Sequence, residues 1–121
     1  MDNTEKILDF IEDKGLDFHI GNAVLLICTA GKAGSKQYVK NIKQAAAYLK
    51  RRLEVKEPIT MSDGKISVRD FFDAQNLDGV LPSVSLAFGL AFVMEDAEEH
   101  VRSHVMVMLA FLNGEVSKYE C

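Results

Sequence analysis

The segment from Lys36 to about Leu53 constrains the fold of this 121-residue chain more than any other segment. Its apolar residues recur at steps of three, four, three and four, at Val39, Ile42, Ala46, Leu49 and Leu53. At about 100° per residue these positions fall in one narrow stripe, which is the pattern of a helix with one buried face. Ser35 stands directly before the segment and is a typical N-cap residue. The rest of the chain must therefore supply apolar faces that cover this stripe.

Two more helices are predicted before this one. Asn3 or Thr4 can cap a helix that runs to Lys14, and Gly15 follows as a C-terminal stop. The apolar stretch 16–30 fits either a buried strand or a buried helix, because a short continuous apolar run has no decisive period. We favour a helix, since the neighbouring segments are helical and no partner strand of similar length is evident.

The segment 59–68 contains the predicted strands of the chain. Its apolar residues alternate around Asp63-Gly64, and Asp-Gly is a favoured pair for the two-residue turn of a β-hairpin. Ser67 then resembles the cap of a short helix that reaches Ala74. The sequence therefore predicts one small hairpin between helical segments.

From residue 83 onwards the pattern is helical again. One helix is expected to end near Met94, and a capping pair at Asp96 and Glu99 starts a last helix that ends at Gly114. A single helix over 83–112 is the alternative. We disfavour it because one straight helix of that length would span most of a small domain.

Length and composition agree with a single helical domain over residues 1–121. Hydrophobic residues make up 48% of the chain, which is enough to build one core without disulfides. The expected fold is mainly α, a compact helical bundle of about five helices with one small β-hairpin at about residues 59–68. No apolar run approaches the roughly 20 residues of a membrane span, and the acidic N-terminus is unlike a secretory signal. We therefore predict a cytoplasmic protein without a membrane partner.

Basic residues are concentrated in the middle of the chain. The segment 32–56 holds eight of the 14 lysines and arginines and a single acid, whereas both flanking segments are acidic. On the predicted helix Lys36, Lys40, Lys43 and Lys50 form a second stripe, which is extended by Arg51, Arg52 and Lys56. Such a surface is suited to an acidic protein or to the phosphates of nucleic acid, although neutralising its own acidic neighbours is the simpler interpretation.

The order of elements suggests one specific nucleic-acid hypothesis. Three helices followed by a hairpin is the order found in winged-helix DNA-binding domains, with the basic 36–53 helix third. The net charge of −4 and the small number of Arg, Asn and Gln side chains on that helix speak against base reading. A nucleic-acid-binding regulator therefore remains an alternative to a protein-interaction role, in which Tyr38, Tyr48 and the lysines contact an acidic partner.

The segment from Cys28 to Ser35 resembles the phosphate-binding loop of cysteine-dependent protein phosphatases. In that loop a cysteine, five residues, an arginine and a Ser or Thr lie between an apolar run and a helix, and the resemblance implies an anion held at the start of the helix. Gly34 stands where the phosphate-clamping arginine belongs, and Ile27 replaces the usual histidine, so phosphatase activity is not expected. What remains is either an ordinary turn or an anion-binding turn made of Gly31, Lys32, Gly34, Ser35 and Lys36.

Two histidines near the C-terminal end are candidate metal ligands. His100 and His104 are four positions apart and share one face of a helix. With Glu99 they offer the ligand types of zinc or another divalent transition metal. Their flanking residues do not match the zinc-protease pattern, and two surface histidines are the alternative interpretation. No other cofactor is predicted, and no nucleophile stands beside a base, so an enzyme is not favoured.

The segment 105–112 is apolar on every side of a helix. Such a helix must be covered all round, either by a central position in a monomer or by a second chain in an oligomer. The leading hypothesis is therefore a non-enzymatic interaction or regulatory module that acts as a homodimer, with the 84–112 region at or near the interface.

Overall fold

The structure of the protein is a computed structural model that describes residues 3–120 apart from 61, 63, 76–78 and 94–97, and omits the side chains of residues 89–100. Within the described residues the chain forms six helices, namely α1 (Asn3–Asp13), α2 (Phe18–Cys28), α3 (Lys36–Glu54), α4 (Val68–Ala74), α5 (Leu81–Val93) and α6 (Glu98–Tyr119). The mainly helical fold is confirmed, with six helices rather than about five. The region 83–112 is divided between α5 and α6, as expected.

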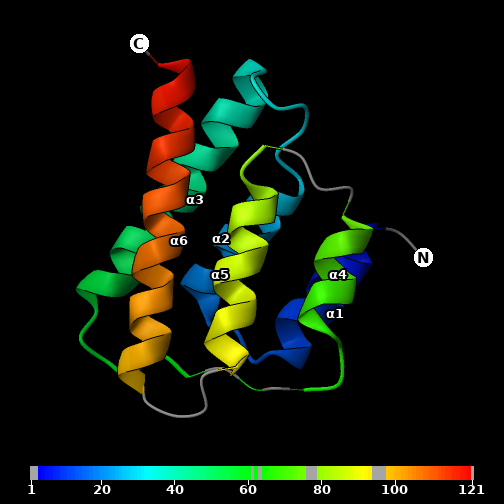
Figure 1. Cartoon of the computed structure of the whole chain (residues 1–121), viewed down its shortest axis with the longest axis vertical. Coiled ribbons are helices and arrows are strands. Elements are labelled where there is room, and N and C mark those ends of the chain that lie inside the picture. The colour runs from blue at the N-terminus through cyan, green and yellow to red at the C-terminus, as the bar shows by residue number, and fades with distance from the viewer. Residues whose placement is uncertain (1–2, 61, 63, 76–78, 94–97, 121) are drawn as a thin grey trace.

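The helices are arranged as two hairpins that pack against each other (Figure 1). One hairpin is formed by α2 and α3, and the other by α5 and α6, while α1 and α4 lie beside them. The hairpins meet where α3 packs against α6 in antiparallel fashion. Tyr38 near the start of α3 contacts Glu115 near the end of α6, whereas the guanidinium of Arg102 donates to the carbonyl of Leu53 at the other end. This pairing places the first residues of α3 beside the last residues of α6.

A cluster of four phenylalanines joins α1, α4 and α5. Phe10 stacks on Phe71 with 3.9 Å between ring centroids and meets Phe72 and Phe88 edge-on or tilted at 5.6 and 5.8 Å. Phe10, Phe72 and Phe88 are almost completely buried. Aromatic side chains bury more apolar surface than other residues, and this cluster therefore holds the short helix α4 in place.

The predicted central helix is present as α3, and Ser35 caps it by accepting a hydrogen bond from the Tyr38 amide. Its buried face is broader than the predicted stripe and is rotated around the helix axis relative to that stripe. Val39 and Leu53 are only half-buried, whereas four residues outside the stripe are buried, namely Tyr38, Asn41, Ala45 and Arg52. Because α3 packs against both α2 and α6, its buried face must serve two neighbours.

The predicted β-hairpin at 59–68 is wrong, since no described residue of that segment is in a strand. The backbone bonds instead to the end of α1. The Asp13 carboxylate accepts from the amides of Lys65 and Ile66, at 2.9 Å each, and the Lys14 carbonyl accepts from the Ser62 amide at 2.7 Å. These long-range partners take the place of cross-strand pairing. The described residues of this segment therefore do not form the wing that the winged-helix hypothesis requires.

The last helix continues beyond its predicted end. Gly114 lies inside α6 at an exposed position, where the backbone remains helical up to Tyr119. The next turn is held by Glu115, which is buried and bonded to α3, and by the half-buried Val116. Because these tertiary contacts outweigh the helix-ending tendency of Asn113-Gly114, the pattern was misleading here.

Candidate anion-binding groove between α3 and α6

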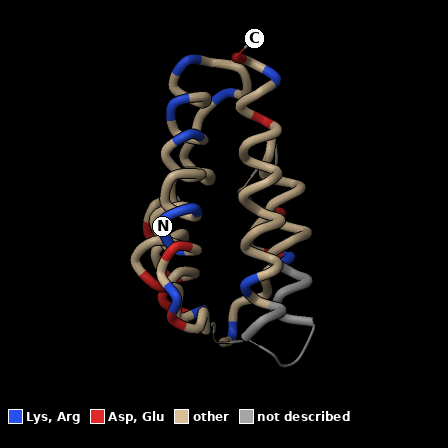
Figure 2. The backbone as a smooth tube through the Cα atoms, turned by 90° about the vertical axis from the view of Figure 1, so that its left-hand side faces the viewer, with Lys and Arg blue, Asp and Glu red and all other residues tan. Residues whose placement is uncertain are grey.

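The predicted basic stripe lies along the outer side of α3. Of the predicted basic residues on this helix, Lys36, Lys40, Lys43, Lys50 and Arg51 are exposed as expected. Figure 2 shows Lys and Arg positions along this layer of the molecule, opposite the layer of α5 and α6. Arg52 differs from them, because its guanidinium is buried, pairs with Asp17 at 2.5 Å and donates to the carbonyl of Pro58. Arg52 therefore stabilises the fold rather than forming part of the basic surface.

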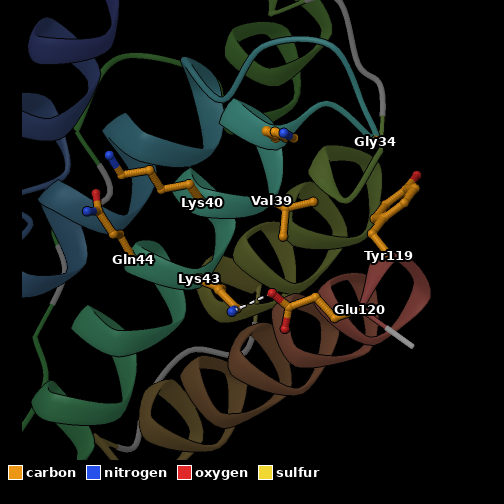
Figure 3. Close-up of a pocket in the computed structure, with 8 residues that line it drawn as sticks. Gly34, Val39, Lys40, Lys43, Gln44, Tyr119 and Glu120 are labelled. Carbon is orange, nitrogen blue, oxygen red and sulfur yellow. Dashed lines mark ion pairs between the residues drawn. The ribbon is translucent and has the colours of Figure 1, made fainter.

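An open groove of about 600 Å³ lies where the start of α3 meets the end of α6. We call it the α3–α6 groove. It is lined by Gly34, Lys36, Val39, Lys40, Lys43, Gln44, Tyr119 and Glu120. Figure 3 shows these residues on the two helices and on the loop before α3, with Lys43 and Glu120 directed toward each other and with Lys40 and Gln44 directed away from Tyr119. The groove brings together Gly34 and Lys36 of the predicted anion-binding turn with Lys40 and Lys43 of the basic stripe.

The positive charge of the groove is only partly neutralised. Lys43 forms an ion pair with Glu120 (Figure 3). Lys36 and Lys40 have no ion-pair partner among the residues that the structure describes. They are four positions apart on one helix, a spacing at which like charges repel. Within the described part of the chain, the groove therefore carries two ammonium groups without an ion pair next to one that has an ion pair.

One wall of the groove is apolar. The ring of Tyr119 lies against the loop, so that a Cβ at Gly34, which has a φ of +89°, would be only 3.2 Å from Tyr119 Cε1. The same ring meets the Tyr38 ring edge-on with 6.0 Å between centroids. Val39 completes this wall. A glycine at position 34 thus permits both the left-handed backbone and the close approach of the tyrosine.

A hydrogen-bond network centred on the buried Tyr38 hydroxyl joins α3 and α6 next to the groove. The Tyr38 hydroxyl donates to the Glu115 carboxylate and accepts from the Val80 amide at 2.9 Å, while Lys118 pairs with Glu115 at 3.1 Å. Burial and the neighbouring carboxylate raise the pKa of Tyr38 well above its usual range. Tyr38 is only 3% exposed, which excludes the predicted role as a partner contact. It instead fixes the distance between α3 and α6.

Only part of the predicted anion-binding turn lies at the groove, and anion binding by it stays a prediction. Gly34 and Lys36 line the groove, whereas Gly31 and Lys32 do not, and the Ser35 hydroxyl is engaged as the cap of α3. Burial raises the pKa of the nearby Cys28 thiol to about 12. Because a nucleophilic cysteine needs a lowered pKa, this environment is opposite to that of a catalytic thiolate.

The proposed metal ligands are only partly within the described residues. His104 is half-buried on α6. The backbone of Glu99 and His100 belongs to the same helix, but their side chains lie outside the described residues. Among the described side chains no group of three His, Cys, Asp or Glu residues is placed to hold a metal ion. The zinc hypothesis for Glu99, His100 and His104 stays a prediction.

A second surface feature is a set of exposed apolar side chains on the neighbouring helices α5 and α6. Leu86 on α5 is 63% exposed, and three apolar residues of α6 are also exposed, namely Met106 at 56%, Val107 at 42% and Phe111 at 36%. By contrast, Val105, Met108 and Leu112 on the inner side of α6 are buried. The helix predicted to be covered all round is therefore covered on one side only. Among the described helices, none combines the length and apolarity needed to cross a membrane.

Comparison with known proteins gives no relative from which a function could be transferred, since no protein-family model, curated protein or solved structure matches the chain.

Proposed function

We propose that the protein is a non-enzymatic interaction module that acts as a homodimer through the outer side of α5 and α6. The observation that carries this proposal is the exposure of Leu86, Met106, Val107 and Phe111 on two adjacent helices. Exposed apolar groups gathered in one area are characteristic of protein interfaces, whereas scattered ones are common on any surface. A second copy of the chain covers such a patch with an identical one, as in a twofold dimer.

The charge pattern supports a second copy as the partner. The sequence has no Lys, Arg, Asp or Glu in Leu81–Val93 or from Ser103 to Gly114. Figure 2 accordingly shows the middle of α6 without charged positions. A charged patch would repel its own copy, whereas an uncharged apolar patch can face itself without an unpaired buried charge. Depletion of charge is also what distinguishes the centre of a protein interface from the rest of the surface.

The test is the mass of the untagged protein in solution by light scattering after gel filtration. We expect a dimer for the wild type and a folded monomer for Val107→Glu, because the added carboxylate would be buried in the interface. Leu8→Glu is the matched control, since Leu8 is 43% exposed on α1, away from the patch, and its replacement should leave the dimer intact. A monomeric wild type at about 100 μM, or a dimer that survives Val107→Glu, would refute the proposal.

A second candidate function is the binding of an acidic partner or nucleic acid along the outer side of α3. It is supported by the five exposed basic side chains on one helical face. Affinity for a polyanion should fall steeply with salt, because each phosphate contact releases counterions. Lys50→Gln with Arg51→Gln should weaken binding to a fluorescent oligonucleotide or to an acidic peptide at low salt. Absence of binding to both probes by the wild type would eliminate this candidate.

A further inference from the structure

We infer that the α3–α6 groove is a binding site for a phosphate monoester with an aromatic body. This inference is independent of dimerisation, because the groove is built from α3, the end of α6 and the preceding loop, whereas the apolar patch lies on the outer side of α5 and α6. It also differs from binding along the whole basic face, since Lys50 and Arg51 do not line the groove.

The charge of the groove calls for a dianion. Lys36 and Lys40 are exposed, adjacent on one helical face and without an ion-pair partner in the described part of the chain. A phosphate monoester carries between one and two negative charges at neutral pH, which matches two ammonium groups better than a single carboxylate does. Lysine binds phosphate as a point charge on a flexible stem, so an open groove suits it. Binding would also relieve the mutual repulsion of the two lysines.

The shape and the apolar wall call for an organic group beside the phosphate. A volume of about 600 Å³ is within the range of small-molecule sites and far larger than inorganic phosphate needs. Tyr119 and Val39 offer an aromatic ring and an aliphatic surface next to the lysines. An aromatic body can pack on the Tyr119 ring while its phosphate meets Lys36, and the flexible Lys40 side chain turns from the direction seen in Figure 3 to reach it.

Glu120 is a built-in competitor at this site. Its carboxylate already pairs with Lys43 at the rim of the groove, so it both lowers the positive potential and repels an incoming anion. Both residues are about half exposed, at 52% and 44%, which means that the pair opens to solvent at little cost. Removing the charge of Glu120 should therefore strengthen phosphate binding. A purely structural role of the Lys43–Glu120 pair would not produce this effect.

The test is a nitrogen-15 NMR titration of the full chain with phenyl phosphate at constant ionic strength. We expect saturable shifts of the Gly34, Lys36 and Tyr119 amides. Inorganic phosphate, which lacks the aromatic ring, and benzyl alcohol, which lacks the phosphate, should each bind at least roughly tenfold more weakly than phenyl phosphate. If a phosphotyrosine peptide binds more tightly than phenyl phosphate, the natural ligand is a phosphorylated protein. If the peptide binds more weakly, the natural ligand is a small molecule.

Variants separate the groove from the general charge of α3. Lys36→Gln with Lys40→Gln should weaken phenyl phosphate binding about tenfold or more, and Glu120→Gln should tighten it severalfold. Lys50→Gln with Arg51→Gln removes the same charge from the same helix outside the groove and should change little. The inference is overturned if phenyl phosphate gives no saturable shift, if inorganic phosphate binds as tightly, or if both double variants lose affinity equally.

Discussion

The hydroxyl of Tyr38 on α3 donates a hydrogen bond to the carboxylate of Glu115 on α6, 77 positions further along the chain. The same hydroxyl accepts a hydrogen bond from the Val80 amide just before α5. One side chain thus connects three helical segments within the core. A Cβ at Gly79 would overlap the Tyr38 hydroxyl, so the backbone at that position is shaped around the phenol.

Replacing Tyr38 by phenylalanine should destabilise the protein by about 1–3 kcal/mol, because the Val80 amide and the Glu115 carboxylate would each lose a buried partner. Urea denaturation followed by circular dichroism measures the change. Tyr48→Phe is the control, since the Tyr48 hydroxyl makes no hydrogen bond within the described residues, and its effect should stay within about 0.5 kcal/mol. Equal effects of the two substitutions would contradict the role given to Tyr38.

Arg51 and Arg52 are neighbours in sequence with opposite surroundings. Arg52 is 6% exposed, pairs with Asp17 and donates to the carbonyls that follow α3, whereas Arg51 is exposed. Arg52→Ala should cost about 2 kcal/mol or more in unfolding free energy, even after allowing for the partial exposure of Asp17. Arg51→Ala should be close to neutral. Chemical denaturation of both variants measures the two changes in unfolding free energy. An unfolding free energy unchanged by Arg52→Ala would contradict the stabilising role given to Arg52.

The Asp13 carboxylate should make stability depend on pH. Hydrogen bonds from the amides of Lys65 and Ile66 lower the pKa of Asp13 in the folded protein. A group with a lowered folded-state pKa contributes stability above its unfolded-state pKa of about 3.9, and this contribution is lost as pH falls through the folded-state value. The stability difference between wild type and Asp13→Asn should therefore be greatest near neutral pH and shrink towards pH 3.

The pH prediction needs a control because other carboxylates titrate in the same range. Asp73 is exposed and its pair with Arg69 is long, at 3.9 Å, so Asp73→Asn should change the unfolding free energy little. Urea midpoints between about pH 3 and pH 7 provide the comparison. A constant difference for Asp13→Asn across that range would show that its carboxylate charge contributes nothing.

Cys28 should be an unreactive thiol in the folded protein. Its pKa is raised to about 12 by burial, so at pH 8 its thiolate fraction is on the order of 10³-fold below that of a free cysteine. Alkylation by iodoacetamide should be slower by a similar factor in the native protein than in urea. The measurement requires a Cys121→Ser background so that only Cys28 is counted. Comparable native and denatured rates would mean that the thiol is accessible and activated.

The predictions that agree with the structure depend on residues that are close in sequence. Ser35 and the 3,4-spaced apolar residues were sufficient to place α3, because capping and one-sided burial depend on neighbours within a few positions. The lysine stripe was exposed as expected for the same reason. The hairpin failed because the turn signal at Asp63-Gly64 competes with Asp13 and Lys14, which lie about 50 positions earlier.

The groove was only half predictable. Gly34 and Lys36 were identified from the turn, and Lys40 and Lys43 from the helix face, but Tyr119 and Glu120 were missed. They come into the site because α6 runs antiparallel to α3, and helix order in space was not encoded in any local pattern. The one available signal was the excess of acids after residue 57, which indicated that an acidic segment would neutralise part of the basic helix.

The bonds from residues 62–66 to the end of α1 have a consequence for the order in which the protein can form during synthesis. The Asp13 carboxylate accepts hydrogen bonds from the amides of Lys65 and Ile66, and the Lys14 carbonyl accepts one from the Ser62 amide. The helix α1 is synthesised before these partners, so its C-terminal end is held at first only by local backbone bonds such as that from the Leu16 amide to the Ile11 carbonyl. Contacts of such sequence separation close late in folding, so a nascent chain halted before residue 62 leaves the end of α1 without these long-range partners.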